Sequence, residues 1–258
     1  TTAAIPDLSG EVAIVTGANS GIGLAGTRSL VAHGATVVMA VRSETRGKNA
    51  AESIPADLSG DVDIRQLDLA SLDSIRVFAD EFTAAYDRLD FLFNNAGVMA
   101  IPRSETEDGF ETQFGVNHLG HFALTAQLFE VLVETPGESR IVTQSSGMHE
   151  RGSIDFEDLQ SERSYDKWDA YAQSKLANVF FALELDRRLD RGGIADVTSV
   201  ATHPGYADTD LQRRGPELSG STVRKWLMQL ANTLFAQPAL AGAWPMLYAA
   251  TDTGITGG

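Results

Sequence analysis

The stretch that decides the fold is TGANSGIG, residues 16–23, which directly follows the apolar run VAIV of residues 12–15. Its glycines, Gly17, Gly21 and Gly23, follow a G-x-x-x-G-x-G spacing. Glycine weakens helices and strands, but it permits a tight turn and lets a ligand approach the backbone closely. A helix that follows such a turn offers unpaired N–H groups and a positive dipole end to a phosphate. The stretch therefore predicts a strand, a phosphate-binding turn and a helix, with a glycine-rich turn that holds no ligand as the alternative.

Short β-rich runs alternate with longer amphipathic stretches along the rest of the chain. Strands are predicted at 12–16, 36–41, 62–67, 91–94, 140–144 and 197–201, and helices near 21–33, 44–53, 71–86, 110–134, 168–190 and 239–250. Strands that alternate with helices of this length indicate a parallel sheet covered on both faces. We therefore expect an α/β fold in one domain, 1–258, built on a single Rossmann-type doubly wound parallel sheet with helices on both faces. The segment 205–237 breaks the alternation and is predicted to be a lid or binding loop.

Composition narrows the class of protein. The 258 residues carry a net charge of −15 and include no cysteine. This charge argues against a nucleic-acid surface and against a polybasic membrane anchor, and the lack of cysteine excludes thiolate chemistry. The N-terminal residues have no signal-peptide pattern, so a cytoplasmic protein is expected. No metal site is expected either, because the five histidines show no H-E-x-x-H pattern; His118 and His121 are interpreted as packing residues.

The second predicted strand carries the signal for cofactor choice. In a dinucleotide-binding fold, its tip meets the adenosine ribose about 20 residues after the last glycine. An acidic residue at this position would accept hydrogen bonds from the ribose 2′-OH and repel a 2′-phosphate. The chain has no acidic residue there; it has Val41 followed by Arg42. A planar guanidinium suits a phosphate. We therefore predict NADP(H), with NAD(H) as the alternative cofactor; a solvated surface arginine is the competing interpretation, and the nearby Glu44 leaves it open.

Acid–base candidates lie further along the chain. Tyr171 and Lys175 are four residues apart in a helical pattern, which places both side chains on one face. A nearby ammonium stabilises a phenolate and lowers its pKa toward the working range. Ser145 and Ser146 end the fifth strand, at the edge where open α/β sheets bind ligands, and NNAG (94–97) ends the fourth. Taken one at a time, an ordinary helix surface and a polar strand-end turn explain these residues equally well.

Together these residues resemble the short-chain dehydrogenase/reductase family over nearly the whole chain. TGANSGIG, Asp68-Leu69, NNAG, Asn117, Ser146, YAQSK (171–175) and Pro204-Gly205 occur in family order. The segment DGFETQFGVNHLGHFALT (108–125), with SKLANV and HPG, is similar to the branch that contains retinol dehydrogenases and protochlorophyllide reductases.

The resemblance implies a role for each matching residue. Tyr171 would donate or accept the proton at the carbonyl or alcohol oxygen, Lys175 would lower its pKa and hold the nicotinamide ribose, Ser146 would polarise the substrate oxygen, and Asn117 would help to hold a proton-relaying water. The glycine turn of Gly17, Asn19, Ser20, Gly21, Ile22 and Gly23 would bind the cofactor, as would Arg42, Asp68, Leu69, Asn95, Ala96, Gly97, Tyr171, Lys175, Pro204, Gly205 and Thr209. The implied activity is reversible hydride transfer between NADP(H) and a carbonyl or alcohol.

Substrate and assembly are predicted less directly. The segment 206–237 combines apolar and aromatic residues with basic ones, which favours an apolar organic small molecule or simple packing of a lid. Relatives often assemble as homodimers or homotetramers through paired helices, and the acidic insertion 152–168 could obstruct that pairing. Two alternative functions stay open: an NADP(H)-sensing binding protein without turnover, and an epimerase or dehydratase on the same fold.

Overall fold

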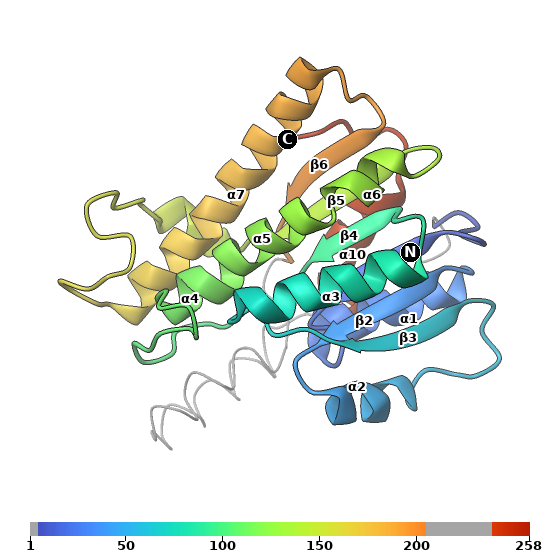
Figure 1. The fold of residues 1–258 in the computed structure, drawn as a ribbon, viewed down its shortest axis with the longest axis horizontal. Helices are drawn as coiled ribbons and strands as arrows, with labels where there is room; N and C mark the ends of the chain where they lie inside the picture. The colour runs from blue at the N-terminus through green and yellow to red at the C-terminus, as the bar shows by residue number, and fades with distance from the viewer. Residues whose placement is uncertain (1–4, 205–238) are drawn as a thin grey trace.

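The computed structural model describes residues 5–204 and 239–258, which form a parallel sheet between two layers of helices (Figure 1). The sheet has six strands in the order β3-β2-β1-β4-β5-β6, all of them parallel to their neighbours. The strands are β1 (Val12–Thr16), β2 (Thr36–Val41), β3 (Asp61–Gln66), β4 (Phe91–Asn94), β5 (Ser139–Gln144) and β6 (Val197–Thr202). Strand order reverses between β1 and β4, where a doubly wound sheet opens its ligand crevice. The predicted fold class is confirmed.

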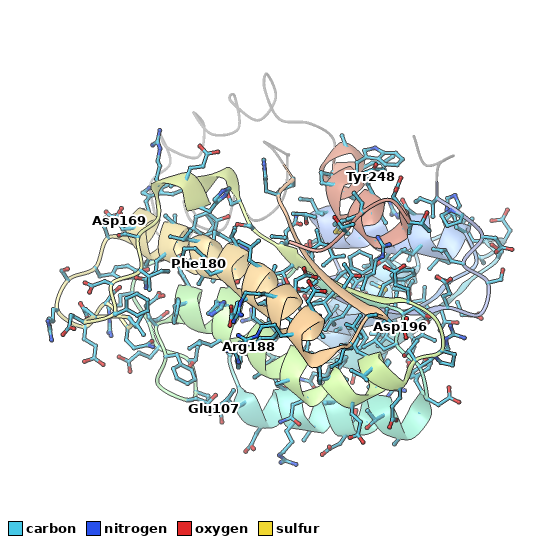
Figure 2. All side chains as sticks on the ribbon, turned by 90° about the horizontal axis from the view of Figure 1, so that it is seen from above. Glu107, Asp169, Phe180, Arg188, Asp196 and Tyr248 are labelled. Atoms are coloured by element: carbon cyan, nitrogen blue, oxygen red, sulfur yellow. The ribbon has the colours of Figure 1, made fainter. Side chains whose placement is uncertain are left out.

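Five of the six strands contribute to two hydrophobic cores because successive side chains point to opposite faces of the sheet, whereas the edge strand β3 contributes Val62 and Ile64 to one core only. In β1, Ala13 and Val15 join one core while Ile14 joins the other. The first core is covered by α1 (Gly21–Ala32), α2 (Glu44–Ala51) and α10 (Ala239–Thr251). The second is covered by α3 (Leu72–Ala85), α5 (Gly120–Gln127), α6 (Phe129–Glu134) and α7 (Lys167–Gly192). Figure 2 shows the result: Phe180 and Arg188 project from α7, on the other side of the sheet from Tyr248 on α10.

The predicted elements match the structure closely, with one informative difference. The helix expected near 110–134 is divided into α4 (Thr112–Phe114), a π-helical turn η2 (Gly115–Leu119), α5 and α6. π-Helical turns are rare, and those that occur are often found at functional sites. This turn contains Asn117. A short 3-10 helix, η3 (Gly147–Arg151), follows β5. The predicted lid at 205–237 lies outside the described residues.

Candidate active site

The glycine turn joins β1 to α1 at the carboxyl edge of the sheet. Gly17 and Gly21 have φ values of +67° and +54°, which favour glycine over residues with a side chain. A Cβ at Gly23 would lie 2.6 Å from the Gly17 carbonyl oxygen and 2.7 Å from Asn95 Nδ2. Asn19, Ser20 and Ile22 complete the turn, all partly buried, and the Ser20 side chain does not cap α1. The first N–H groups of α1 are therefore left for a bound anion.

The segment after β4 is fastened to this turn by hydrogen bonds. Asn95 Nδ2 donates to the Thr16 carbonyl at 2.8 Å, and the Asn95 and Ala96 amides both donate to Thr16 Oγ1 at 2.9 Å. Gly97 lies next to the acid–base residues, since a Cβ there would be 3.0 Å from Asn117 Oδ1 and 3.6 Å from Lys175 Nζ. The cofactor residues predicted on two separate strands thus form one surface.

Lys175 and Tyr171 project from α7 toward the end of β5. The Lys175 ammonium donates to the Gln144 carbonyl at 3.0 Å, and burial lowers the pKa of Lys175 from 10.5 to about 8. Burial also raises the pKa of the Tyr171 hydroxyl, and a hydrogen bond with Ser146 offsets this only in part. This direction is opposite to the predicted lowering, because the cost of burying a phenolate dominates.

The two serines that end β5 have different partners. Ser145 is buried, and its hydroxyl donates to the Lys175 carbonyl at 2.7 Å. Ser146 is half-buried; its Oγ accepts from the Met148 amide at 3.3 Å and its side chain also reaches the Tyr171 hydroxyl. The structure therefore brings Ser146, rather than Ser145, to Tyr171.

Asn117 joins the segment after β4 to α7. Its Nδ2 donates to the Val98 carbonyl and to Ser174 Oγ, both at 2.9 Å, and its Oδ1 accepts from the Val98 amide at 2.7 Å. Its main-chain carbonyl accepts from Asn178 Nδ2 at 3.1 Å and is 3.0 Å from His121 Nδ1. This carbonyl already has two protein partners, so a relaying water would have to compete for it.

The remaining predicted cofactor residues lie along the same edge. Arg42 directly follows β2 and is exposed, and its carbonyl accepts from Gln66 Nε2 at 3.4 Å. The Asp68 side chain accepts a hydrogen bond from the Ala70 amide at 3.0 Å. Leu69 is buried, and its carbonyl oxygen lies so close to Gly120 that a Cβ on Gly120 would be 2.5 Å from it. Pro204 follows β6. Gly205 and Thr209 lie outside the described residues.

Comparison with known proteins identifies the family. Residues 11–217 match the model of the short chain dehydrogenases. The chain belongs to the short-chain dehydrogenase/reductase family. Mouse retinol dehydrogenase 11 is 45% identical over 249 residues, which cover 96% of this chain and 75% of that protein. Mouse polyprenol dehydrogenase is 44% identical over 257 residues, covering 98% and 75%. These relatives place the chain in the retinol dehydrogenase-like branch.

Solved structures agree with this assignment. The crystal structure of an uncharacterized protein from Mycobacterium paratuberculosis superposes with a TM-score of 0.79 at 40% identity, covering 99% of this chain and 82% of that one. A Beutenbergia cavernae protein, provisionally described as an NAD(P) dependent gluconate 5-dehydrogenase with bound NADP at low occupancy, gives a TM-score of 0.71 at 27% identity, covering 95% and 91%. The fold of this short-chain dehydrogenase is therefore shared with proteins that bind a nicotinamide dinucleotide.

The acidic insertion of this family member packs beside the start of α7. Gln173 holds it in place: its Oε1 accepts from the Asp155 amide at 3.0 Å and its Nε2 donates to the Leu159 carbonyl at 3.1 Å. Arg103 Nε adds a bond to the Ser161 carbonyl at 3.0 Å. The insertion thereby becomes part of the surface next to α5 and α7.

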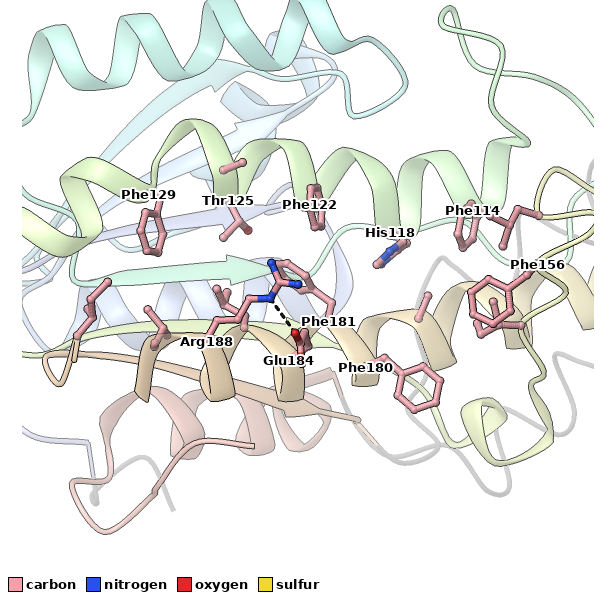
Figure 3. A pocket seen from close by; sticks show the side chains of 17 residues that line it. Phe114, His118, Phe122, Thr125, Phe129, Phe156, Phe180, Phe181, Glu184 and Arg188 are labelled. Carbon is pink, nitrogen blue, oxygen red and sulfur yellow. Dashed lines mark hydrogen bonds and ion pairs between the residues drawn. The ribbon is translucent and has the colours of Figure 1, made fainter. Parts of the chain in front are cut away.

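An apolar groove of about 720 Å³ runs between α5 and α7 and ends at this insertion (Figure 3). Phe114, Phe122 and Phe129 line one side, and Phe180 and Phe181 line the other, with Phe156 of the insertion at one end. Tyr171 and Lys175 face β5 instead and do not line the groove. The groove is therefore separate from the acid–base residues.

Several residues that shape the site were not predicted. One of them is Thr16, which fastens the segment after β4 to the glycine turn. The others are Gln144 and Asn178, which join the end of β5 to α7. Asn178 lies seven residues after Tyr171 in α7, so the same helical spacing that joins Tyr171 to Lys175 also reaches it. That spacing was the available signal. Thr16 belongs to the quoted motif, but its side-chain bonds depend on β4 and could not be read from the sequence.

Two features are absent from the described residues. None of the described helices has the length and apolar character needed to cross a membrane. Within residues 5–204 and 239–258, no group of three or more histidine and carboxylate side chains could hold a metal ion.

Proposed function

We propose that this short-chain dehydrogenase is an NADP(H)-dependent oxidoreductase that transfers hydride between the nicotinamide and a carbonyl or alcohol of an apolar organic substrate. The observation that carries the proposal is the grouping of Ser146, Tyr171 and Lys175 at the carboxyl edge of the sheet, beside the glycine turn. Hydride donors, proton donors and a developing alkoxide must meet at one place in such a reaction. These residues supply the proton and the polar contacts there.

The residues present fit a nicotinamide dinucleotide. The turn at Gly17 and Gly23 has room for no side chain, and the adjacent first N–H groups of α1 suit a pyrophosphate. Among the described residues, the buried Lys175 ammonium has one hydrogen-bond partner, Gln144, so it has further N–H donors to offer ribose hydroxyls. The cofactor, when bound, supplies the hydride chemistry.

The protein residues then manage the proton. Because burial raises its pKa, Tyr171 keeps its proton at neutral pH and can donate it to a carbonyl oxygen that takes up a hydride. Ser146 lies beside the Tyr171 hydroxyl and can donate a second hydrogen bond to the same oxygen. Lys175, when charged, stabilises the phenolate that Tyr171 leaves behind. Tyr171 would donate its proton during carbonyl reduction and would accept one during alcohol oxidation.

Cofactor preference rests on Arg42. The guanidinium directly follows β2, where the adenosine ribose is expected, and it forms no ion pair with the described residues. Glu44, the nearest acidic residue, is paired with Lys48 at 3.1 Å. Asp68 and Leu69 would line the adenine pocket. The Beutenbergia cavernae structure, which holds NADP at low occupancy, is an example of the shared fold with this cofactor.

The apolar substrate is inferred from the relatives. Their names assign them retinol and polyprenol, which are long apolar alcohols. The predicted lid would contact the substrate, and it lies outside the described residues. We propose an apolar alcohol or aldehyde of this class for the present chain.

The test is a fluorescence titration with NADPH and NADH, followed by turnover of an aldehyde and ketone panel that includes retinal. Selective NADPH binding with reduction of a long apolar aldehyde is the expected result. NADPH binding with no turnover of any carbonyl would favour the sensor. Turnover with no net change in the oxidation state of the cofactor would favour an epimerase or dehydratase.

We propose that the apolar groove is covered by a second copy of the chain in a homodimer or homotetramer, because Phe122 and Phe180 on its two walls are each 53% exposed. The acidic insertion reaches one end of the groove, where Phe156 lines it (Figure 3). The predicted cytoplasmic location also remains a proposal, which fractionation of cells would test.

A further inference from the structure

His121 is a buried histidine in the first turn of α5 that the proposed reaction does not use. It is 1% exposed, and its burial lowers the pKa from 6.5 to about 3. The ring is therefore neutral across the range in which a dehydrogenase works, so one ring nitrogen is a donor and the other is an acceptor.

The partners of His121 decide which nitrogen carries the proton. Nδ1 lies 3.0 Å from the Asn117 carbonyl oxygen, which can only accept. The proton must therefore be on Nδ1, and Nε2 accepts from the Thr16 hydroxyl, whose oxygen is 2.9 Å away. Thr16 Oγ1 already accepts from the Asn95 and Ala96 amides, so it is a donor toward His121, with its one proton shared between Nε2 and the more distant Phe93 carbonyl at 3.2 Å.

This chain of bonds connects the two halves of the site, which are the cofactor-binding half (the glycine turn with the NNAG segment) and the acid–base half (Asn117 with Lys175 of α7). At one end, Thr16 fixes the NNAG segment beside the glycine turn. At the other end, Asn117 fixes Val98 and Ser174, which precedes Lys175. Between them, His121 holds the π-helical turn that presents Asn117.

We propose that His121 is a positioning residue, which sets the placement of Asn117 and Lys175 relative to the cofactor-binding turn through its bonds to Thr16 and to the Asn117 carbonyl. The inference rests on the proposed function and adds a residue to it. Within the described residues, His121 is hydrogen-bonded to Thr16 and Asn117 and not to Tyr171 or Lys175, so it acts through Asn117.

The two partners of His121 do not depend on it for hydrogen bonding. The Thr16 hydroxyl lies 3.2 Å from the Phe93 carbonyl and can donate there instead. The Asn117 carbonyl keeps its bond from Asn178 Nδ2 at 3.1 Å. Loss of the imidazole nitrogens would therefore leave no orphaned partner, so the fold is expected to tolerate it while the relative position of the two halves loosens.

Three substitutions separate the two bonds. His121→Phe keeps a ring and removes both bonds. His121→Asn can retain a donor near the Nδ1 position, and His121→Gln can retain an acceptor near the Nε2 position. Ser139→Ala is the matched control, because Ser139 is also fully buried and loses one bond, to the Leu132 carbonyl at 2.9 Å, at the opposite end of β5.

The measurements are kcat and KM with NADPH and retinal, the Kd for NADPH, and the melting temperature. We expect His121→Phe to lower kcat about tenfold, with Kd for NADPH and melting temperature close to those of Ser139→Ala, since a misplaced group costs rate even when binding survives. His121→Asn should recover part of kcat. An unchanged kcat in His121→Phe overturns the proposal, and so does an equal loss of kcat, NADPH binding and melting temperature, which marks a purely structural histidine.

A readout that needs no turnover keeps this inference separate from the proposed function. In ¹⁵N-histidine spectra, the signal missing from His121→Phe should be a neutral ring protonated on Nδ1 and unchanged down to pH 5. Protonation of the His121 ring on Nε2, or titration near pH 6, overturns the proposed link from Thr16 to Asn117, with or without turnover by the enzyme. If the wild-type chain binds NADPH but reduces no carbonyl, the proposed function fails, and these spectra still decide whether His121 joins Thr16 to Asn117.

Discussion

The Lys175 ammonium lies 5.9 Å from the centroid of the Tyr171 ring. Both side chains are buried where α7 meets the end of β5, and the ammonium donates there to the Gln144 carbonyl. The same burial acts on the two groups in opposite directions. It lowers the pKa of Lys175 to about 8 and raises the pKa of Tyr171. Each shift disfavours the charged form, so the site holds its positive charge at a cost in stability.

That cost predicts a stabilised but inactive variant, Lys175→Met. Unfolded Lys175 keeps its proton up to a pKa of 10.5, whereas the folded residue loses it near 8. The cost is thus fully present below pH 8 and disappears as pH rises toward 10.5, because the unfolded state binds more protons in that window. At 1.36 kcal/mol per pKa unit it is on the order of 3 kcal/mol, and the lost bond to Gln144 offsets about 1 kcal/mol.

Urea denaturation at pH 7 and pH 9.5 measures this effect. Lys175→Met should be more stable than the wild type by roughly 2 kcal/mol at pH 7, with a smaller difference at pH 9.5. Its carbonyl reductase activity should be lost. A variant that is less stable at pH 7 would show that the ammonium is better solvated than its burial indicates.

Tyr171→Phe tests the proton donor directly. The ring and its packing remain, but no hydroxyl is left for the substrate oxygen or for Ser146. General acid catalysis contributes about 10²- to 10⁴-fold, so kcat with NADPH and retinal should fall by that factor. The Kd for NADPH should stay within about twofold of the wild type, since the glycine turn and the Lys175 ammonium are unchanged in the variant. A residual rate above one tenth would remove Tyr171 from this role.

The sequence predicts the fold, and which residues lie together at the carboxyl edge of the sheet, better than it predicts the bonds between them. Alternating strands and helices, the glycine spacing and the pair Tyr171 and Lys175 are local patterns, and each reappears in the structure. The direction of the Tyr171 pKa depends on burial, which a spacing rule does not contain. The bonds from Thr16 to the segment after β4, and from Asn178 to Asn117, join elements far apart in the chain. Only the packed structure reveals them.

Gly23→Ala tests the cofactor cradle. Its Cβ would meet the Gly17 carbonyl oxygen at 2.6 Å, and backbone cannot move aside cheaply. We expect a loss of stability of about 1–3 kcal/mol from overpacking and a Kd for NADPH raised at least tenfold. Gly26→Ala on the same helix is the control, because its Cβ meets only the flexible end of Met246. Calorimetry and fluorescence titration compare the two. Equal losses of stability and NADPH affinity in both variants would mean that any added side chain on α1 has this effect, and that the glycine turn has no special role.

Arg42→Asp tests the choice of cofactor. A charge-assisted hydrogen bond contributes about 1.5–3 kcal/mol, so the preference for NADPH over NADH should fall by roughly 10- to 100-fold. Arg76→Asp on the exposed side of α3 makes the same charge change away from the site. Competition titrations with both nucleotides give the ratio. If the ratio is the same in Arg42→Asp and in the wild type, the guanidinium does not bind the 2′-phosphate.

Phe180→Glu tests the proposed assembly. Phe180 lines the groove between α5 and α7 and is 53% exposed, so a carboxylate there would be buried without a partner if a second copy covers the groove. Light scattering after gel filtration should give a multiple of 27.6 kDa for the wild type and a single chain for the variant. Val77→Glu is the control, because Val77 is a similarly exposed apolar residue, 45% exposed, on α3. A wild-type monomer, or an assembly that Phe180→Glu leaves intact, would show that the second copy does not cover this groove.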